Sequence, residues 1–273
     1  MNLQSRVALS NGVEIPWLGL GVYKSPPGTA TEQAVRWALE LGYRHIDTAS
    51  YYMNEKDVGN AIKKSGFDRA EIFVTSKIWN SDQGYDSALR AFDVSRKRLD
   101  MDIIDLYLIH WPVRDTFLET WKALERLYTD GKVRAIGVSN FLVHHLVKII
   151  EQFDIVPAVN QVEFHPFLLQ RELYEFDSSH DIQHEAWSPL TRGARLNDRV
   201  ITEIAEKHDR TPAQVFLRWD LQLGVVTIPK SVRRERIKEN SEVFDFELDD
   251  EDMNRIQALD ASERFGSNPD AIG

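Results

Sequence analysis

Two side chains that can handle protons lie five residues apart in the stretch 42–55, the carboxyl group of Asp47 and the phenol of Tyr52. A short apolar run leads into Asp47, small residues follow it, and a helix is expected to begin near Asn54. Lys77 and His110 follow Asp47 at successive intervals of 30 and 33 residues. Acid, phenol, amine and imidazole are groups that polarise a carbonyl and transfer a proton to its oxygen.

Close together, these four groups would have distinct tasks. We expect Lys77 to pair with Asp47 and to sit against the Tyr52 hydroxyl, where an ammonium lowers the pKa of a phenol. His110 would donate to an incoming carbonyl oxygen or supply the proton. None of the four can supply electrons, so the chemistry requires a hydride donor. Singly, each has a structural explanation, as an ion pair, a packed phenol or a core histidine.

The elements that carry these groups alternate between strand and helix. Strands are predicted at 17–21, 45–47, 72–77, 105–110, 133–139, 158–162, 182–187 and 225–230. Helical periodicity lies between them, at 31–41, 55–64, 86–99, 117–128, 144–151, 172–178, 200–208 and 212–223. Eight such units without a composition break predict an α/β fold, a single (β/α)8 TIM barrel spanning residues 1–273.

Two segments lie outside the repeat. Asn11-Gly12 between apolar runs predicts a hairpin over 7–15, which would plug the N-terminal end of the barrel. A helix and an irregular tail are expected over about 249–273. Gly19-Leu20-Gly21 suggests a dinucleotide fold, but Lys24 replaces the third glycine and Pro26-Pro27 follows, so we reject a Rossmann domain.

All strand C-termini of such a barrel meet at one mouth. The expected last residues are Gly21, Asp47, Lys77, His110, Ser139, Gln161, Trp187 and Lys230. Trp187 could stack on a nicotinamide ring, and Ser139, Asn140 and Gln161 could bind its carboxamide. The basic run 230–238 follows the last strand, where barrels often bind phosphate, although such a run is also typical of a solvated helix face. Lys230 and Arg236 would suit a 2′-phosphate, which favours NADPH over NADH.

Composition limits the other possibilities. The net charge of −10 argues against a nucleic-acid or membrane-surface partner. The chain has no cysteine, no apolar run long enough to span a membrane and no signal-peptide pattern, which indicates a cytoplasmic protein without disulfides. His144-His145 has no accompanying ligand set, so we expect no metal site.

Several motifs resemble the aldo-keto reductase family, whose catalytic tetrad is Asp, Tyr, Lys and His. They are Asp47 with Tyr52, Lys77, His110-Trp111-Pro112, residues 131–141, residues 160–166, Trp187-Ser188-Pro189-Leu190 and residues 228–232. The resemblance covers nearly the whole chain and implies a barrel that binds NADP(H), with Tyr52 as the general acid, Asp47 and Lys77 tuning it, and His110 orienting the substrate.

The same resemblance implies the residues that contact ligands. The cofactor set is Gly21, Val22, Tyr23, Asp47, Ser139, Asn140, Gln161, Trp187, Ser188, Leu190, Lys230, Ser231, Val232, Arg233, Arg236, Glu239 and Asn240. The expected substrate pocket comprises Trp17, Tyr23, Tyr51, Trp79 and Trp111. Three residues depart from the family pattern: Met53, Thr191 where glycine is usual, and Asp220 where histidine is common.

Short loops after Trp111 and Trp187 make the chain most similar to the bacterial aldehyde and 2,5-diketo-gluconate reductase branch. This implies a monomer that reduces small aldehydes, α-ketoaldehydes such as methylglyoxal, or keto sugars. One alternative is an NADPH-binding regulatory subunit with negligible turnover, as in relatives of potassium-channel β-subunits, although those usually carry an N-terminal extension. Another is a barrel enzyme that acts on a phosphorylated metabolite without nicotinamide.

Overall fold

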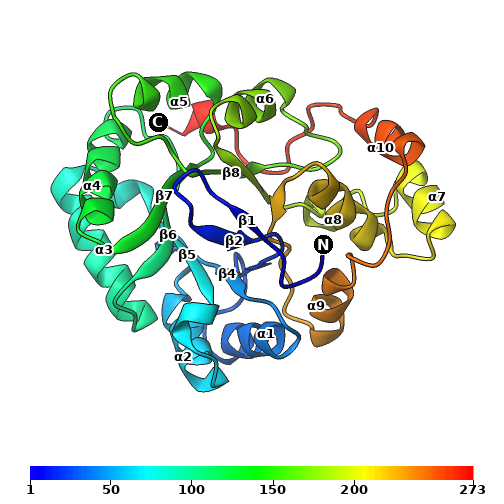
Figure 1. Cartoon of the computed structure of the whole chain (residues 1–273), viewed down its shortest axis with the longest axis horizontal. Helices are drawn as coiled ribbons and strands as arrows, with labels where there is room; N and C mark the ends of the chain where they lie inside the picture. The colour runs from blue at the N-terminus through cyan, green and yellow to red at the C-terminus, as the bar shows by residue number, and fades with distance from the viewer. Residues whose placement is uncertain (273) are drawn as a thin grey trace.

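Eight parallel strands curl into a barrel surrounded by helices (Figure 1) in the computed structural model, which describes residues 1–272. Around the barrel the strands follow chain order, and each pairs in parallel with the next. They are β3 (Leu20–Gly21), β4 (His45–Asp47), β5 (Phe73–Ile78), β6 (Ile104–Ile109), β7 (Val133–Ser139), β8 (Val159–Glu163), β9 (Gln183–Trp187) and β10 (Val226–Thr227). The predicted (β/α)8 barrel is confirmed.

The barrel closes where the first strand meets the last. Leu18 bridges to Thr227 and Gly21 to Lys230, both in parallel, and the Gly21 amide donates to the Pro229 carbonyl at 3.2 Å. A Cβ on Gly21 would lie 2.7 Å from the Ile228 carbonyl oxygen, so this seam requires glycine. Both seam strands are only two residues long, shorter than the predicted 17–21 and 225–230.

Helices follow the strands with bounds close to those predicted. They are α1 (Thr29–Glu40), α2 (Glu55–Ser65), α3 (Tyr85–Leu99), α4 (Phe117–Thr129), α5 (Val143–Ile150), α6 (Arg171–Ser179), α7 (Arg199–Lys207), α8 (Pro212–Gln222), α9 (Arg234–Ser241) and α10 (Asp250–Gln257). Thr211 caps α8 in a capping box with Gln214, and Pro212 occupies the first turn. Among these described helices, none combines the length and apolar character needed to cross a membrane.

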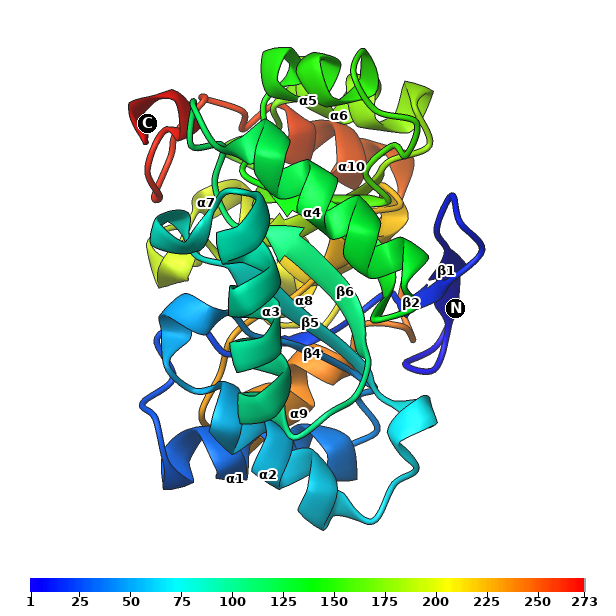
Figure 2. The same ribbon diagram turned by 90° about the vertical axis from the view of Figure 1, so that its left-hand side faces the viewer.

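The hairpin and the C-terminal tail lie at opposite ends of the barrel (Figure 2). Strands β1 (Arg6–Ala8) and β2 (Glu14–Pro16) pair antiparallel, as predicted. Leu9 and Ile15 pack with Phe73 of β5 and with inward residues of other strands in a separate apolar cluster. The hairpin therefore closes one end of the barrel, and the ligand site must open at the other. The tail, expected to be irregular, contains a short 3-10 helix, Pro269–Ala271.

Side chains alternate between the two faces of a strand, so every second residue of each strand points into the barrel. Along β5, Phe73 belongs to the cluster under the hairpin, and Thr75 and Lys77 follow on the same face. The interior thus changes from apolar to polar toward the mouth. Strand ends differ slightly from those predicted: β5 continues to Ile78 and β8 to Glu163. His110 follows directly after β6, and Lys230 lies three residues beyond β10.

Close helix packing generates the first testable prediction. A Cβ on Gly59 of α2 would lie 2.2 Å from the carbonyl oxygen of Leu99 at the end of α3. Gly59→Ala should therefore destabilise the protein by about 1–3 kcal/mol despite the higher helix propensity of alanine. Urea unfolding measures this. The exposed Lys56 on the same helix provides the control, since Lys56→Ala should change stability by less than about 0.5 kcal/mol. Equal stability of both variants would contradict the packing argument.

Candidate active site

A buried ion pair forms the centre of the site. The Lys77 ammonium is fully buried and donates to both carboxylate oxygens of Asp47 at 2.7 Å, as the sequence predicted. It also donates to the Thr48 carbonyl at 2.9 Å and to the Tyr52 hydroxyl at 3.4 Å. Of these partners the Asp47 carboxylate and the Thr48 carbonyl act as acceptors, and the phenol is the one with a proton of its own to donate.

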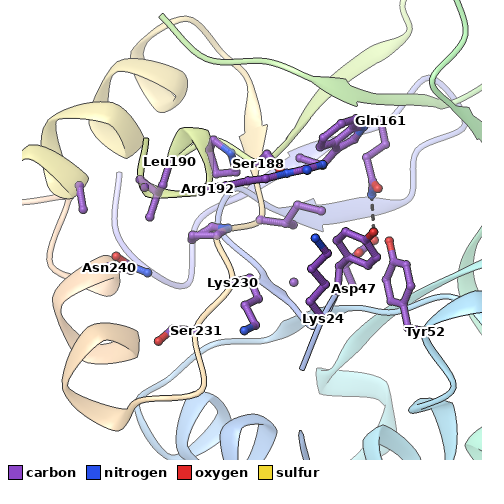
Figure 3. A pocket seen from close by; sticks show the side chains of 18 of the residues that line it. Lys24, Asp47, Tyr52, Gln161, Ser188, Leu190, Arg192, Lys230, Ser231 and Asn240 are labelled. Carbon is purple, nitrogen blue, oxygen red and sulfur yellow. Dashed lines mark hydrogen bonds between the residues drawn. The ribbon is translucent and has the colours of Figure 1, made fainter. Parts of the chain in front are cut away.

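Asp47 is held from a second side by an amide. Gln161 of β8 donates to Asp47 Oδ2 at 2.8 Å, the contact drawn in Figure 3, and to Glu185 Oε2 of β9 at 3.0 Å. Burial raises the pKa of Asp47, whereas the Lys77 charge and the two donors lower it. With Lys77 in contact with both oxygens, we describe the pair as ionised and neutral overall.

Tyr52 reaches the pair from the loop after β4. Residues Ser50–Tyr52 form a single 3-10 turn, and Met53 ends it in the left-handed conformation, with φ of 59°. The expectation that Lys77 lowers the pKa of Tyr52 is wrong for this structure. Burial raises that pKa well above its ordinary value, and the charge of Asp47 raises it further. Asp47 compensates the nearby ammonium, so Tyr52 is a protonated phenol at neutral pH.

His110 lies beside Tyr52 and is surrounded by aromatic rings. Burial, followed by the Lys77 charge, lowers the pKa of His110 well below its ordinary value, so the imidazole is neutral. Its ring lies edge-on to Tyr52, with centroids 5.6 Å apart, and edge-on to Trp79 at 5.1 Å. Tyr51 stacks on Trp79 at 3.8 Å. A neutral imidazole among aromatic rings can donate a hydrogen bond to an uncharged carbonyl in an apolar pocket.

A cavity of about 950 Å³ runs from the aromatic rings around His110 across the mouth of the barrel to α9. The predicted ligand residues along it are Gly21, Tyr23, Asp47, Tyr51, Trp79, Trp111, Ser139, Asn140, Gln161, Trp187, Ser188, Leu190, Lys230, Ser231, Arg236, Glu239 and Asn240. Tyr52 and His110 line it as well, whereas Lys77 is fully buried and outside the lining. Figure 3 shows Tyr52, Asp47 and Gln161 at one end, and Ser231 and Asn240 at the other.

Four predicted ligand residues lie elsewhere within the described chain. Val22 is fully buried, Val232 packs against the core, and Arg233 is exposed and outside the lining. Trp17 precedes β3 and packs against both apolar clusters, including the one under the hairpin. It is therefore at the closed end of the barrel, because its position before β3 places it a strand's length from the mouth.

The far end of the cavity is cationic. Burial and the neighbouring ammonium of Lys24 lower the pKa of Lys230, as expected where like charges crowd together. Arg236 of α9 also lines the cavity, whereas the Arg192 guanidinium lies 5.9 Å from the centre of the Trp187 ring. Such crowding favours an anionic ligand, which would offset the repulsion. Lys24 and Arg192 were missed from the sequence because neither lies in a strand end or in the basic run.

Contacts within the chain hold the Trp187 ring in place. Its indole N–H donates to Asn140 Oδ1 at 2.9 Å, and Asn140 Nδ2 donates to the His110 carbonyl at 2.9 Å. A Cβ on Gly266 of the tail would lie 2.3 Å from the Trp187 ring, so only glycine permits this contact. Asn140 therefore orients the Trp187 ring and ties it to the loop that carries His110.

The loop after Trp187 carries backbone strain at the departure from the family pattern. Thr191 and Arg192 both have positive φ, 51° and 53°, and Gly193 follows at 87°. For a β-branched residue this conformation is unfavourable, and glycine relieves it. The buried Thr191 hydroxyl compensates in part, by accepting from the Arg195 amide at 3.0 Å and donating to the Leu190 carbonyl at 2.7 Å.

One cluster of possible metal ligands exists among the described residues: His144, His145 and Asp270. His145 Nδ1 accepts the Leu142 amide at 3.2 Å, so the neutral ring carries its proton on Nε2. That nitrogen faces Asp270 at 3.6 Å. The arrangement suits hydrogen bonding to a carboxylate that anchors the tail.

Removing one partner of the buried pair provides a second prediction. Lys77→Met should lower the free energy of unfolding by about 3–5 kcal/mol, because it leaves the Asp47 carboxylate buried without a counter-charge. Adding Asp47→Asn should recover much of that loss, since the uncompensated charge is then gone. Denaturant unfolding of the single and double variants measures both. A single variant as stable as the original chain would show that the pair contributes nothing.

With the geometry described, similarity to known proteins can be assessed. The model of the aldo/keto reductase family matches residues 18–261. Glyoxal reductase of Bacillus subtilis is 56% identical over 271 residues, covering 99% of this chain and 98% of the relative. Methylglyoxal reductase DkgA of Salmonella typhimurium is 44% identical, covering 98% of each.

A solved structure of a Gox0644 mutant in complex with NADPH has a TM-score of 0.93 and 47% identity, and the match covers 98% of each chain. Family model, sequence relatives and solved structure all extend over the strands that carry Asp47, Lys77 and His110. The chain belongs to the aldo/keto reductase family.

Proposed function

We propose that the protein reduces aldehydes and ketones to alcohols with NADPH, and that Tyr52 is the general acid. The observation that carries this proposal is the contact of the Tyr52 hydroxyl with the buried Lys77–Asp47 pair beside a neutral His110. Reductase relatives at 44–56% identity support it. Small carbonyl compounds, in particular α-ketoaldehydes such as methylglyoxal, are the proposed substrates, because both relatives are named for such compounds.

The cavity fits the proposed cofactor. Its volume of about 950 Å³ lies at the upper end of the usual range for ligand pockets, about 300–1,000 Å³. Trp187 offers a fixed aromatic face at the catalytic end, and Lys230, Ser231 and Arg236 offer phosphate donors at the other. NADPH supplies a hydride when bound. The complex of the Gox0644 mutant with NADPH is consistent with this assignment.

Each catalytic side chain then has a role that follows from its surroundings. Tyr52 holds a proton at neutral pH because its pKa is raised, and it transfers that proton to the carbonyl oxygen. The resulting phenolate is stabilised by the Lys77 ammonium 3.4 Å away. Asp47 fixes this ammonium and balances its charge. His110 donates to the carbonyl oxygen and orients it toward Tyr52.

The aromatic residues around His110 would define the substrate pocket. Tyr51 is about half exposed and Tyr23 more than one-third, so the rings at the mouth remain open to solvent. An open, flat-walled pocket accepts small carbonyl compounds of varied shape and sets little size limit. A steady-state comparison of methylglyoxal, aromatic aldehydes and keto sugars would rank them.

We also propose that the chain acts as a monomer in the cytoplasm and forms one domain, whose last residue lies outside the described part. The absence of cysteine suits a reducing compartment. The closed barrel leaves no unpaired edge between its first and last strands through which copies would associate. Sedimentation of the purified chain tests the monomer.

The general-acid role is tested by Tyr52→Phe. Loss of the proton donor should lower kcat for carbonyl reduction by roughly 10²–10⁴-fold, while NADPH still quenches tryptophan fluorescence with an unchanged Kd. Tyr128→Phe removes a hydroxyl that contacts Asn11 near the hairpin, and serves as the matched control with full activity. Undiminished turnover in Tyr52→Phe would refute the assignment. NADPH binding without turnover of any carbonyl by the unmodified chain would instead support the regulatory-subunit alternative.

Cofactor choice is tested at α9. Arg236→Ala should raise the KM for NADPH by about tenfold or more and leave that for NADH nearly unchanged, because a charged hydrogen bond to the 2′-phosphate is lost. Arg234→Ala on the same helix is the control, since Arg234 is exposed and outside the cavity lining. An equal effect on both cofactors would contradict the location of the 2′-phosphate.

A further inference from the structure

Glu185 is a buried carboxyl group under the catalytic residues that the mechanism above does not use. It lies in the middle of β9 and its side chain has no exposed surface. Its register partner across the sheet is Gln161, and both point into the barrel. In the sequence it is a charged residue within the predicted strand 182–187.

Gln161 connects Glu185 to the ion pair. The single amide nitrogen of Gln161 donates to Asp47 Oδ2 at 2.8 Å and to Glu185 Oε2 at 3.0 Å. An amide NH₂ has two protons, so both are committed. The Gln161 carbonyl oxygen is therefore the group left for a ligand in the cavity that Gln161 lines. Glu185 and Asp47 together determine which way this amide faces.

The charge balance of the interior requires Glu185 to be neutral. The titratable groups that face it are Asp47 and His45 of β4, Lys77 of β5 and, farther off, Tyr52. Burial lowers the pKa of His45 to about 3, so Lys77 is the only cation and Asp47 already neutralises it. A second carboxylate would be a buried charge without a partner, which is costly. Burial and the charge of Asp47 accordingly raise the pKa of Glu185 to about 8.

The two carboxyl oxygens of Glu185 have different surroundings. Glu185 Oε1 has no hydrogen-bond partner among the described residues and lies 3.8 Å from His45 Nε2. That nitrogen already bonds to Thr75 Oγ1 at 3.1 Å. A neutral Glu185 can therefore carry its proton on Oε1 while Oε2 accepts from Gln161.

The geometry points to Glu185 as a positioning residue for the proposed carbonyl reduction: as a neutral acid it orients the Gln161 amide, which in turn holds Asp47 against Lys77. The expected effect of Glu185 on turnover rests on the proposed function. Ionised Glu185 adds a negative charge that disfavours the Tyr52 phenolate formed on proton transfer. Turnover should therefore fall as pH rises through about 8, the pKa of Glu185.

Glu185→Gln is the informative variant, since glutamine mimics the neutral acid at every pH. Its oxygen can accept from Gln161, as the neutral acid does. We expect kcat close to the original value at pH 7, with the decline around pH 8 abolished. Asp220→Asn is the matched control, because Asp220 is also a buried acid of raised pKa but is bonded to Thr227, outside the site. It should retain the decline. A decline with unchanged midpoint in Glu185→Gln would overturn the proposed role of the charge.

Protonation of Glu185 can be measured without turnover. A carboxyl group whose pKa rises from 4.5 unfolded to about 8 folded binds its proton more tightly in the native state. Its contribution to stability is complete below pH 4.5 and is lost as pH rises to 8. Urea midpoints should therefore show the original chain losing stability relative to Glu185→Gln across this window, with a constant difference above it. A difference independent of pH would overturn the assignment even if no carbonyl substrate were reduced.

Positioning itself is tested by Glu185→Leu, which removes the acceptor from Gln161. A crystal structure should show the Gln161 amide turned away from Asp47 Oδ2, and kcat should fall about tenfold with little change in the KM of the carbonyl substrate. An unmoved Gln161 with full turnover would overturn the proposal. If this variant does not fold, Glu185→Gln still decides the question. Failure of the unmodified chain to reduce any carbonyl would refute the proposed function alone.

Discussion

Everything at the mouth of this barrel depends on keeping the Lys77 ammonium out of water. An isolated buried ammonium is costly, and the protein offsets the cost with two Asp47 oxygens and the Thr48 carbonyl. Only the contact with Tyr52 remains for chemistry. Because Asp47 cancels the ammonium's charge in the resting state, the cation does not deprotonate the phenol in advance. It is placed to stabilise the phenolate after the proton has left.

The barrel makes this arrangement possible by separating two kinds of interior. Under the hairpin, apolar side chains from several strands pack around Leu9 and Ile15, and a larger apolar cluster lies between the strands and the helices. Toward the mouth the same faces of the strands carry Thr75, Lys77, Gln161 and Glu185 in one hydrogen-bonded interior. Lys77 and the Gln161 amide are fully partnered in this polar interior, whereas Glu185 Oε1 and His45 Nδ1 have no partner among the described residues. The exposed rings of Tyr23 and Tyr51 then form the rim.

The cavity also resolves an apparent conflict of charge. The chain carries a net charge of −10, which would repel an anionic ligand, yet Lys24, Lys230 and Arg236 gather at one end of the cavity. Local charges dominate there because solvent screens interactions beyond about 10 Å at ordinary ionic strength. The two ends of the cavity therefore suit different ligand groups. Cationic side chains at one end suit an anionic group, and aromatic rings with a neutral proton donor at the other end suit an uncharged carbonyl.

The order of strands and helices could be predicted from the sequence because the hydrophobic period and the residues that begin or end an element are local properties. Asn11-Gly12 in the hairpin turn and Thr211-Pro212 at the start of α8 illustrate this. The meeting of Asp47, Tyr52, Lys77 and His110 followed from the rule that parallel strand ends converge. Strand ends were off by a few residues at Gln161 and Lys230, since pairing with neighbours decides where a strand stops. Trp17 was assigned to the substrate pocket, although it begins the predicted strand 17–21 and therefore lies at the end of that strand away from the mouth.

What the sequence by itself determined was therefore the element order, the catalytic residue types and their convergence. Only the tertiary structure decided the protonation states. The pKa of Tyr52 is raised because burial outweighs an ammonium already compensated by Asp47, and neither effect can be read from residue spacing. The same holds for Glu185, whose place under the ion pair depends on the register between β8 and β9. Desolvation and register are properties of the assembled barrel, so they exist only after folding.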